Sequence, residues 1–281
     1  MKILLLAAAC GCALAQGPSP APDIDEIMSR VASNQTKSQD QRKEWVYNQK
    51  QLLRMVRGNR KVAREERREY VIAPGEVPIQ KELVKFEGKY ESHGKYTSYD
   101  HPGYSYKEVD IDGDIINDLS EDMTNDKGSH DGIGHDLFPL TRDEQKKYNF
   151  KLKGTETYRD RAVFRVSFEP KPHPPEGDGG SWKGDALIDA QEYQPVVVTT
   201  SLAYKIPMAV KILLGTNIKG LGFSVAYQKF ADGVWFPVSY GGEFDVRAVF
   251  FYKRTISVSM TNSDFRRTDV TTKVAYAIED K

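Results

Sequence analysis

Short β-prone runs with alternating apolar and polar residues fill most of the second half of the chain. The alternation is clearest in residues 148–152 and 162–168, and further short runs follow from 182 to 252, each interrupted by Gly, Pro or Asp-Gly. Because successive side chains of a strand point to opposite faces, this pattern predicts antiparallel strands with one apolar face. We therefore predict a curved antiparallel sheet with one face too apolar to be left in water.

A helix is predicted before the first strand. Ile24, Ile27, Met28 and Val31 fall on one face at helical spacing, and Asp23 can cap the N-terminus. A helix with a single apolar side is suited to lying against a sheet.

The segment from 44 to 72 fits both strand and helix spacing, so periodicity alone does not decide its structure. The β-prone residues WVY at 45–47 and the turn signal Gly58-Asn59 favour a hairpin. The run RGNRKVAREERRE at 57–69 mixes both charge signs. We interpret it as a solvated strand edge or helix face.

Residues 87–136 are rich in Tyr, Gly and Asp, and we predict an elaborated insertion over one rim of the sheet. Asp112-Gly113 is predicted to be a hairpin turn. A second turn is predicted at Thr261-Asn262, between the last strands.

The N-terminus has the composition of an export signal. Lys2 supplies the positive start, an apolar run follows, and Ala13-Leu14-Ala15 is a small-x-small cleavage site. We predict a signal peptide at 1–15, a flexible Pro-rich leader at 16–22 and a single β domain at 23–281.

Both cysteines, Cys10 and Cys12, lie inside this signal. A mature chain that begins near Gln16 would have neither a disulfide nor thiol chemistry. Lipid modification of one of the two cysteines is the alternative, but the apolar stretch before either is short.

Composition argues against several functional classes. The formal net charge is zero and 39% of the residues are hydrophobic, which disfavours a nucleic-acid binder and a polybasic membrane anchor. No later run reaches the roughly 18 apolar residues of a membrane-spanning helix. The sequence contains neither GxSxG nor a phosphate-binding glycine loop, so it supports no enzyme and no cofactor.

Two acidic or histidine-containing segments imitate metal sites. Asp110, Asp112, Asp114 and Glu121 have the spacing of a calcium loop, but Ile115 occupies the position that requires glycine. The cluster from His130 to Asp136 does not match a zinc spacing. Solvated loop residues remain the preferred interpretation of both, and a metal-dependent hydrolase remains an alternative.

Several motifs together resemble a known family. They are the signal peptide, the amphipathic helix, WVY, FPL before YNFKLKG, WKGDALID, DGVWFP and the closing FRR. In this order they resemble the LolA/LolB/RseB-like outer-membrane lipoprotein carriers. The resemblance is loose over 23–72 and better over 137–270, while 87–136 departs from the pattern.

The resemblance implies a mainly β (α+β) fold: a curved antiparallel unclosed β-barrel, a covering N-terminal helix and a loop or helix lid. It implies a monomeric, non-enzymatic periplasmic protein. Such a protein would carry acyl chains of lipoproteins or other lipids in a hydrophobic cavity, and inner- or outer-membrane delivery proteins would be its further partners. The alternative is an envelope sensor or structural domain whose core is filled by its own side chains.

The predicted cavity residues are aromatic side chains from the β-prone runs: Trp45, Tyr47, Phe150, Phe164, Trp182, Trp235 and Phe250. Arg266 and Arg267, in the closing FRR, are predicted to pair with carboxylates at the sheet rim. Contact with a ligand head group is the second interpretation.

Overall fold

The computed structural model describes residues 22–73, 80–122, 138–172, 182–203, 216–230, 233–248 and 252–268. Its elements are α1 (Ile24–Arg42), β1 (Trp45–Val56), β2 (Val62–Ala73), β3 (Gln80–Ser92), β4 (Lys95–Tyr99), α2 (Ile111–Asp122), α3 (Arg142–Gln145), β5 (Tyr148–Tyr158), β6 (Arg161–Pro170), β7 (Trp182–Asp189), β8 (Pro195–Leu202), β9 (Thr216–Lys219), β10 (Gly222–Lys229), β11 (Trp235–Ala248) and β12 (Tyr252–Arg267).

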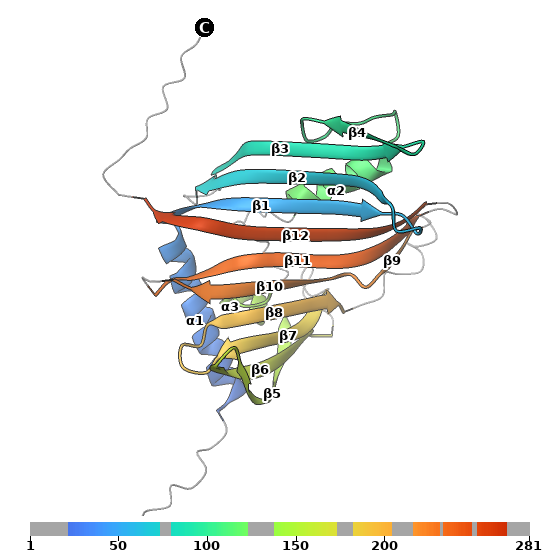
Figure 1. The fold of residues 1–281 in the computed structure, drawn as a ribbon. Coiled ribbons are helices and arrows are strands. Elements are labelled where there is room, and N and C mark those ends of the chain that lie inside the picture. The colour runs from blue at the N-terminus through green and yellow to red at the C-terminus, as the bar shows by residue number, and fades with distance from the viewer. Residues whose placement is uncertain are drawn as a thin grey trace, which may run out of the picture.

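The twelve strands form one antiparallel sheet with two free edges. Its order is β4-β3-β2-β1-β12-β11-β10-β8-β7-β6-β5, with β9 paired to β11 beside this path (Figure 1). The strands bend around one face, and the two edge strands, β4 and β5, do not meet. The predicted fold, a mainly β, curved and unclosed antiparallel sheet with an N-terminal helix, is confirmed.

Helix α1 begins where the capping signal predicts. The Asp23 carboxylate accepts a hydrogen bond from the backbone N–H of Asp25 at 3.2 Å. Ile27 and Val31 are fully buried against the sheet, on the face that we call the inner face. The apolar stripe of α1 therefore covers this face, across which the helix runs in Figure 1.

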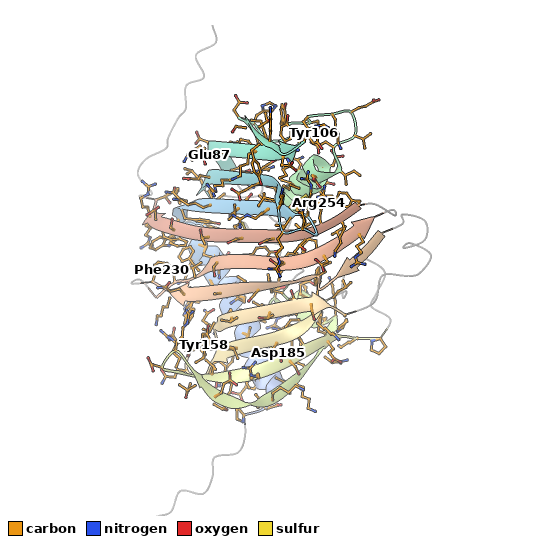
Figure 2. All side chains as sticks on the ribbon, turned by 45° about the vertical axis from the view of Figure 1, so that its right-hand side comes forward. Glu87, Tyr106, Tyr158, Asp185, Phe230 and Arg254 are labelled. Carbon is orange, nitrogen blue, oxygen red and sulfur yellow. The ribbon has the colours of Figure 1, made fainter. Side chains whose placement is uncertain are left out.

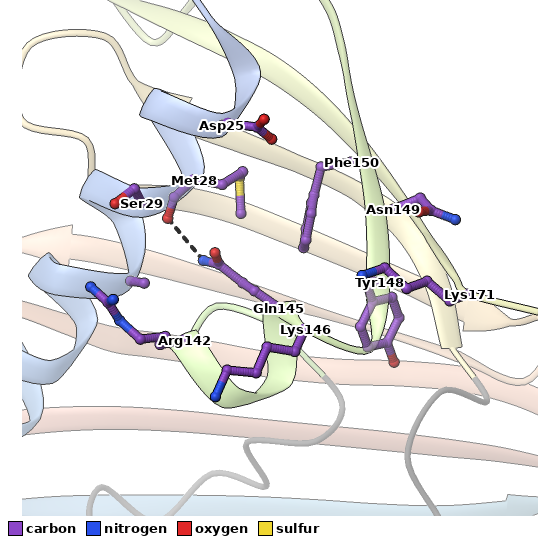
Figure 3. Close-up of a pocket in the computed structure, with 11 residues that line it drawn as sticks. Asp25, Met28, Ser29, Arg142, Gln145, Lys146, Tyr148, Asn149, Phe150 and Lys171 are labelled. Carbon is purple, nitrogen blue, oxygen red and sulfur yellow. Dashed lines mark hydrogen bonds between the residues drawn. The ribbon is translucent and has the colours of Figure 1, made fainter. Parts of the chain in front are cut away.

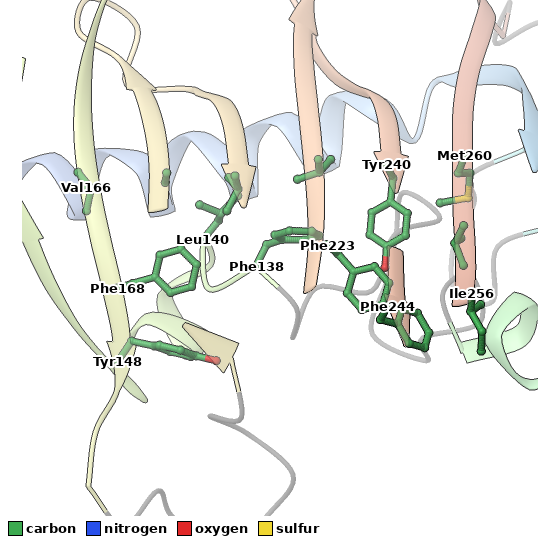
Figure 4. Packing of buried hydrophobic residues seen from close by; sticks show 14 of the residues in the cluster. Phe138, Leu140, Tyr148, Val166, Phe168, Phe223, Tyr240, Phe244, Ile256 and Met260 are labelled. Carbon is green, nitrogen blue, oxygen red and sulfur yellow. The ribbon is translucent and has the colours of Figure 1, made fainter. Parts of the chain in front are cut away.

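One row of paired residues crosses the inner face from β5 to β3. From Leu152 onward it passes through Val166, Ala186, Val198, Val225, Tyr240 and Met260, and then through Gln51, Arg68 and Phe86. The row is apolar as far as β12 and turns polar at β1. Figure 4 shows the apolar part, where Phe223 stacks on Tyr240 with ring centroids 5.4 Å apart.

Two glycines allow close approach within this sheet. A Cβ at Gly184 of β7 would overlap the carbonyl oxygen of Thr199 on β8. A Cβ at Gly88 of β3 would overlap the ring of Tyr99. Glycine at both positions lets a neighbouring strand or ring pass directly over the backbone.

The hairpin predicted from 44 to 72 is confirmed as β1 and β2. The solvated interpretation of its charged run holds for 58–61 and Arg67 but is wrong for the residues between and beside them. Arg64, Glu66 and Arg68 are 1–3% exposed and lie on the inner face, and Glu65 is also buried. Arg64 and Glu66 are paired with Tyr99 and Asp110, which lie more than 30 residues away in sequence, so a local charge pattern does not reveal their burial.

Both predicted turns are also wrong. Asp112 and Gly113 belong to the first turn of α2, and Asp110 before them accepts a hydrogen bond from the backbone N–H of Gly113 at 3.2 Å. Thr261 and Asn262 lie within β12.

The segment predicted as an insertion starts as part of the sheet. Its first residues complete β3, and β4 then pairs with the last residues of β3, from Gly88 to Ser92. Helix α2 follows and lies on the inner face, where Ile116 is fully buried.

Candidate functional site

The predicted cavity aromatics do not form one group. Phe164 is buried in the main cluster of the inner face, and Phe150 and Trp182 pack at its margin. Tyr47 packs with Tyr70 and Ile72 in a separate cluster.

The remaining predicted aromatics lie elsewhere. Trp45 packs edge-on against Phe236, with ring centroids 5.4 Å apart. Trp235 belongs to a further cluster with Val163, Leu187 and Val196. Phe250 lies outside the described residues. The structure thus brings together Phe150, Phe164 and Trp182 and separates the others.

A cavity of about 460 Å³ opens between α1, α3 and the edge strand β5 (Figure 3). Met28 and Ala32 of α1 form one wall, and Tyr148 and Phe150 of β5 form the other. Phe150 and Met28 point toward each other across the space. The apolar part of this cavity is therefore continuous with the core of the inner face.

Helix α3 is positioned by specific polar contacts. Thr141 caps its N-terminus, and Gln145 donates hydrogen bonds to the carbonyl oxygens of Met28 at 3.0 Å and Leu140 at 2.9 Å. Leu140 and Phe138, the ends of the FPL motif, are buried in the core beside it. These contacts fix the width of the cavity between α1 and α3.

The rim of the cavity is polar and mainly cationic. Arg142, Lys146 and Lys171 line it, together with Asp25. Lys146 also bonds to Asp143 at 2.7 Å and thereby lowers the pKa of that carboxyl below its ordinary value. A cavity with an apolar part at Met28, Tyr148 and Phe150 and a larger polar and charged lining suits an amphiphilic molecule.

Sequence reasoning missed most of the cavity-lining residues. Met28 was identified only as a core residue of the helix, and Arg142 and Gln145 were not selected at all. The usable signal was the capped turn at Thr141 that directly precedes β5.

The other end of the inner face carries a buried charge network, which we call the Arg64 network. The Arg64 guanidinium donates to Asp110 at 2.5 Å and to the Tyr99 hydroxyl at 2.7 Å, and Tyr99 donates to Glu66 at 2.6 Å. Arg68 donates to the same Glu66 at 2.6 Å. The two arginines and two carboxylates balance in charge, as buried ions require.

The network shifts the pKa values of its members. Burial, together with the adjacent Glu66 carboxylate, raises the pKa of Tyr99 well above its ordinary value. Burial alone would lower the pKa of Arg64, but its contacts with Tyr99, Asp110 and Glu66 outweigh burial and raise it.

Helix α2 is attached to this polar region by further contacts. Asp112 accepts hydrogen bonds from Tyr252 at 2.7 Å and from Arg254 at 2.9 Å. Ser120 donates to the Gln51 side chain at 2.9 Å. Polar groups therefore attach the helix to β12 and β1, in addition to the buried side chain of Ile116.

The acidic residues that imitate a calcium loop have other roles. Asp110 and Asp112 bind arginines of the sheet, as described above. Within the described ranges, no three potential ligands gather around a metal position. The His130–Asp136 cluster lies outside the described residues.

The prediction that the closing FRR pairs with a rim carboxylate is confirmed for Arg267. Its Nε donates to Glu44 at 2.9 Å. Within the same described ranges, no helix combines the length and apolar content needed to cross a bilayer.

Comparisons with known proteins give likenesses of fold. No family model matches the chain, and no curated protein matches its sequence. It is similar to the structure of a putative outer membrane lipoprotein-sorting protein domain from Vibrio parahaemolyticus, with 10% identity, a TM-score of 0.36 and coverage of 89% of this chain and 96% of the other.

Two further solved structures are similar. A DUF1329 family protein from Desulfovibrio piger has 11% identity and a TM-score of 0.35, with coverage of 90% and 96%. A LolA superfamily protein from Nitrosomonas europaea has 9% identity and a TM-score of 0.32, with coverage of 89% and 96%. The function is therefore argued from the geometry of the site.

Proposed function

We propose that the protein is a non-enzymatic carrier or binding protein for an amphiphile, such as the acyl chain of a lipid or lipoprotein. The observation that carries this proposal is the cavity between α1, α3 and β5, whose apolar side chains, Met28, Tyr148 and Phe150 among them, continue into the core and whose remaining lining is polar and charged. Each methylene transferred from water into such a space contributes about 0.8 kcal/mol. A short length of acyl chain would therefore supply useful affinity.

The position of the cavity supports loading from one side. It lies at the free edge strand β5, where α1 and α3 can separate from the sheet without breaking strand pairing. The export signal predicted from the sequence and the family resemblance support a periplasmic location for this function, with membrane delivery proteins as further partners. The protein would act as a monomer.

A second candidate is an envelope sensor or structural domain that binds no amphiphile. The observation in its favour is the tight packing of the inner face, where Val166, Val198 and Val225 are fully buried. Under this alternative, the cavity would hold only water.

Binding of a dansyl-labelled fatty acid to delipidated protein distinguishes the two candidates. The carrier predicts saturable binding with enhanced dansyl fluorescence. Phe150→Asp should weaken it roughly tenfold or more, because an acidic group would replace an apolar wall. Leu83→Asp, the same kind of change at an exposed position of β3, is the matched control and should leave binding unchanged.

Mass spectrometry of lipids that copurify with the protein supplies an independent test. Folded protein that neither retains lipid nor binds the probe would contradict the carrier and support the self-filled domain.

A further inference from the structure

A second recess lies at the end of the sheet where the β5–β6 hairpin turns; we call it the hairpin recess. It has a volume of about 330 Å³ and shares no lining residue with the cavity of Figure 3. Tyr158, labelled in Figure 2, stands at the hairpin end of this recess. The volume is at the lower end of the range for small-molecule sites.

Aromatic and aliphatic side chains form its walls. Tyr158, Tyr227 and Trp235 come from β5, β10 and β11, and Val196 and Val197 come from β8. Apolar residues from four strands thus converge on one side of a small recess whose remaining lining is polar. This composition suits a planar or branched apolar group.

Three cations surround these walls: Arg159, Arg161 and Lys229. The Arg161 guanidinium lies 5.4 Å from the centre of the Trp235 ring, and that of Arg159 lies 5.3 Å from the centre of the Tyr158 ring. The guanidinium groups of both arginines thus lie beside aromatic rings at the edge of the recess.

The nearby carboxylates are already engaged. Glu192 accepts hydrogen bonds from Lys229 at 2.8 Å and from the Trp235 indole at 3.0 Å. Burial would raise the pKa of Glu192, but these two bonds outweigh burial and lower it, so the group is ionised. Asp189 accepts from Arg161 at 3.0 Å.

Arg159 is different from the other two cations. In the part of the chain that the structure describes, it forms no ion pair, and the neighbouring Asp160 does not line the recess. Arg159 and Asp160 are the two loop residues of the hairpin and both have positive φ, 48° and 64°. This is the arrangement of a type I′ turn, which usually employs Asn and Gly.

We propose that the hairpin recess is a second ligand site, which takes a small aryl carboxylate. The aryl group would fill the apolar space between Tyr158, Tyr227 and Val197, and the carboxylate would pair with Arg159. The ion pairs of Arg161 and Lys229 hold their side chains at the border of the site. This proposal does not depend on amphiphile binding by the cavity at β5.

Isothermal titration of the full chain with naphthoate tests the proposal, with naphthylmethylammonium as the probe of opposite charge. We expect saturable binding of naphthoate and none of the ammonium compound. Arg159→Gln should weaken naphthoate binding about tenfold, since it removes a charge-assisted contact. Lys183→Gln, which removes an exposed cation of β7 outside the recess, should have no effect.

Variants with a larger side chain in the hairpin recess provide a second test. Val197→Trp, or Ala226→Leu if the former fails to fold, should abolish naphthoate binding while the circular dichroism spectrum and the dansyl fatty acid titration remain unchanged. Equal binding of the two naphthyl probes, or naphthoate binding that is indifferent to Arg159→Gln and to a folded filling variant, would overturn the proposal. Absence of any naphthoate binding at millimolar concentration would overturn it equally.

Discussion

Both ends of the inner face are buried, but one end is filled by apolar side chains and the other by paired charges. In the row that crosses the sheet, Val198 and Val225 are fully buried at one end and Arg68 is 3% exposed at the other. The strand geometry is the same at both ends. What differs is the cover, since α1 presents apolar residues such as Ile27 and Val31 to its part of the sheet, whereas α2 presents Asp112 and Ser120 to the other, with Asp110 directly before the helix.

This difference has an energetic meaning. Apolar burial stabilises in proportion to area and tolerates modest substitutions. A buried ion network contributes little net stability because desolvation offsets attraction, but loss of one member leaves its partners charged and buried. We therefore expect the charged end to be more sensitive to a single substitution than the apolar end.

The largest effect is expected from Arg64→Ala. Removal of this guanidinium would leave Asp110 buried without its cation and Glu66 with Arg68 alone, which should lower the free energy of unfolding by about 3–5 kcal/mol. Guanidinium chloride unfolding measures this loss. Arg67→Ala, at a 55% exposed side chain of the same strand, should change it by less than about 0.5 kcal/mol.

A smaller loss at Arg64 than at an apolar core position would contradict the comparison. So would a loss equal to that of Arg67→Ala, because the Arg64 network would then behave like a surface ion pair.

Ile188→Ala tests the apolar end. Ile188 is fully buried on β7, so truncation should cost about 3 kcal/mol through lost transfer free energy and a residual cavity. Chemical denaturation provides the measurement, with Leu83→Ala at an exposed position as the control. An effect as small as that of the control would show that this part of the core is not tightly packed.

Ser120→Ala should have a moderate effect of about 1 kcal/mol. It removes the donor to the Gln51 side chain, which remains buried and bonded to Gln49 at 3.0 Å. Hydrogen exchange of α2 amides should increase along with the loss of stability. If the exchange of these amides is unchanged, this contact does not hold α2 on the sheet.

The smallest effect is a loss of stability at alkaline pH, which does not occur at neutral pH. The pKa values of Tyr99 and Tyr252 are both raised in the folded protein above the ordinary 10.0. Their contribution to stability is therefore complete below pH 10 and is lost as the pH rises from there towards their folded values. Ultraviolet absorption of tyrosinate should show two tyrosines that ionise only with unfolding, and Tyr252→Phe should reduce this number by one.

Local sequence patterns are sufficient to predict those helices and strands whose signals lie within a few residues of one another. The cap at Asp23, the apolar stripe of α1 and the alternation of β5 and β6 each specify their element directly. They were insufficient where burial depends on distant partners. Arg64, Glu66 and Arg68 alternate with the period of a strand face, but only the fold shows that Asp110 balances their charge and that the Tyr99 hydroxyl joins Arg64 to Glu66.

The candidate site was harder to predict than the fold. Aromatic side chains such as Trp45 and Trp235 were selected for their size, but size does not tell which cluster a ring joins. The register shifts at Ala226/Tyr227 and Val46/Asn48 alter which side chains meet at the strand ends. Such irregularities arise from pairing between strands and leave no clear local signal.

The strand order has a consequence for the route by which the chain folds. β1 to β4 form one run of neighbouring strands, β5 to β8 with β10 form another, and the hairpin β11–β12 lies between them. β12, the last strand within the described residues, pairs with β1 over residues about 200 positions apart in sequence, from Trp45 with Arg267 to Val56 with Thr255. Such non-local pairing makes folding slow. The two runs can form early from local contacts, but they become a single cooperative unit only when the C-terminal hairpin is inserted as the centre of the sheet.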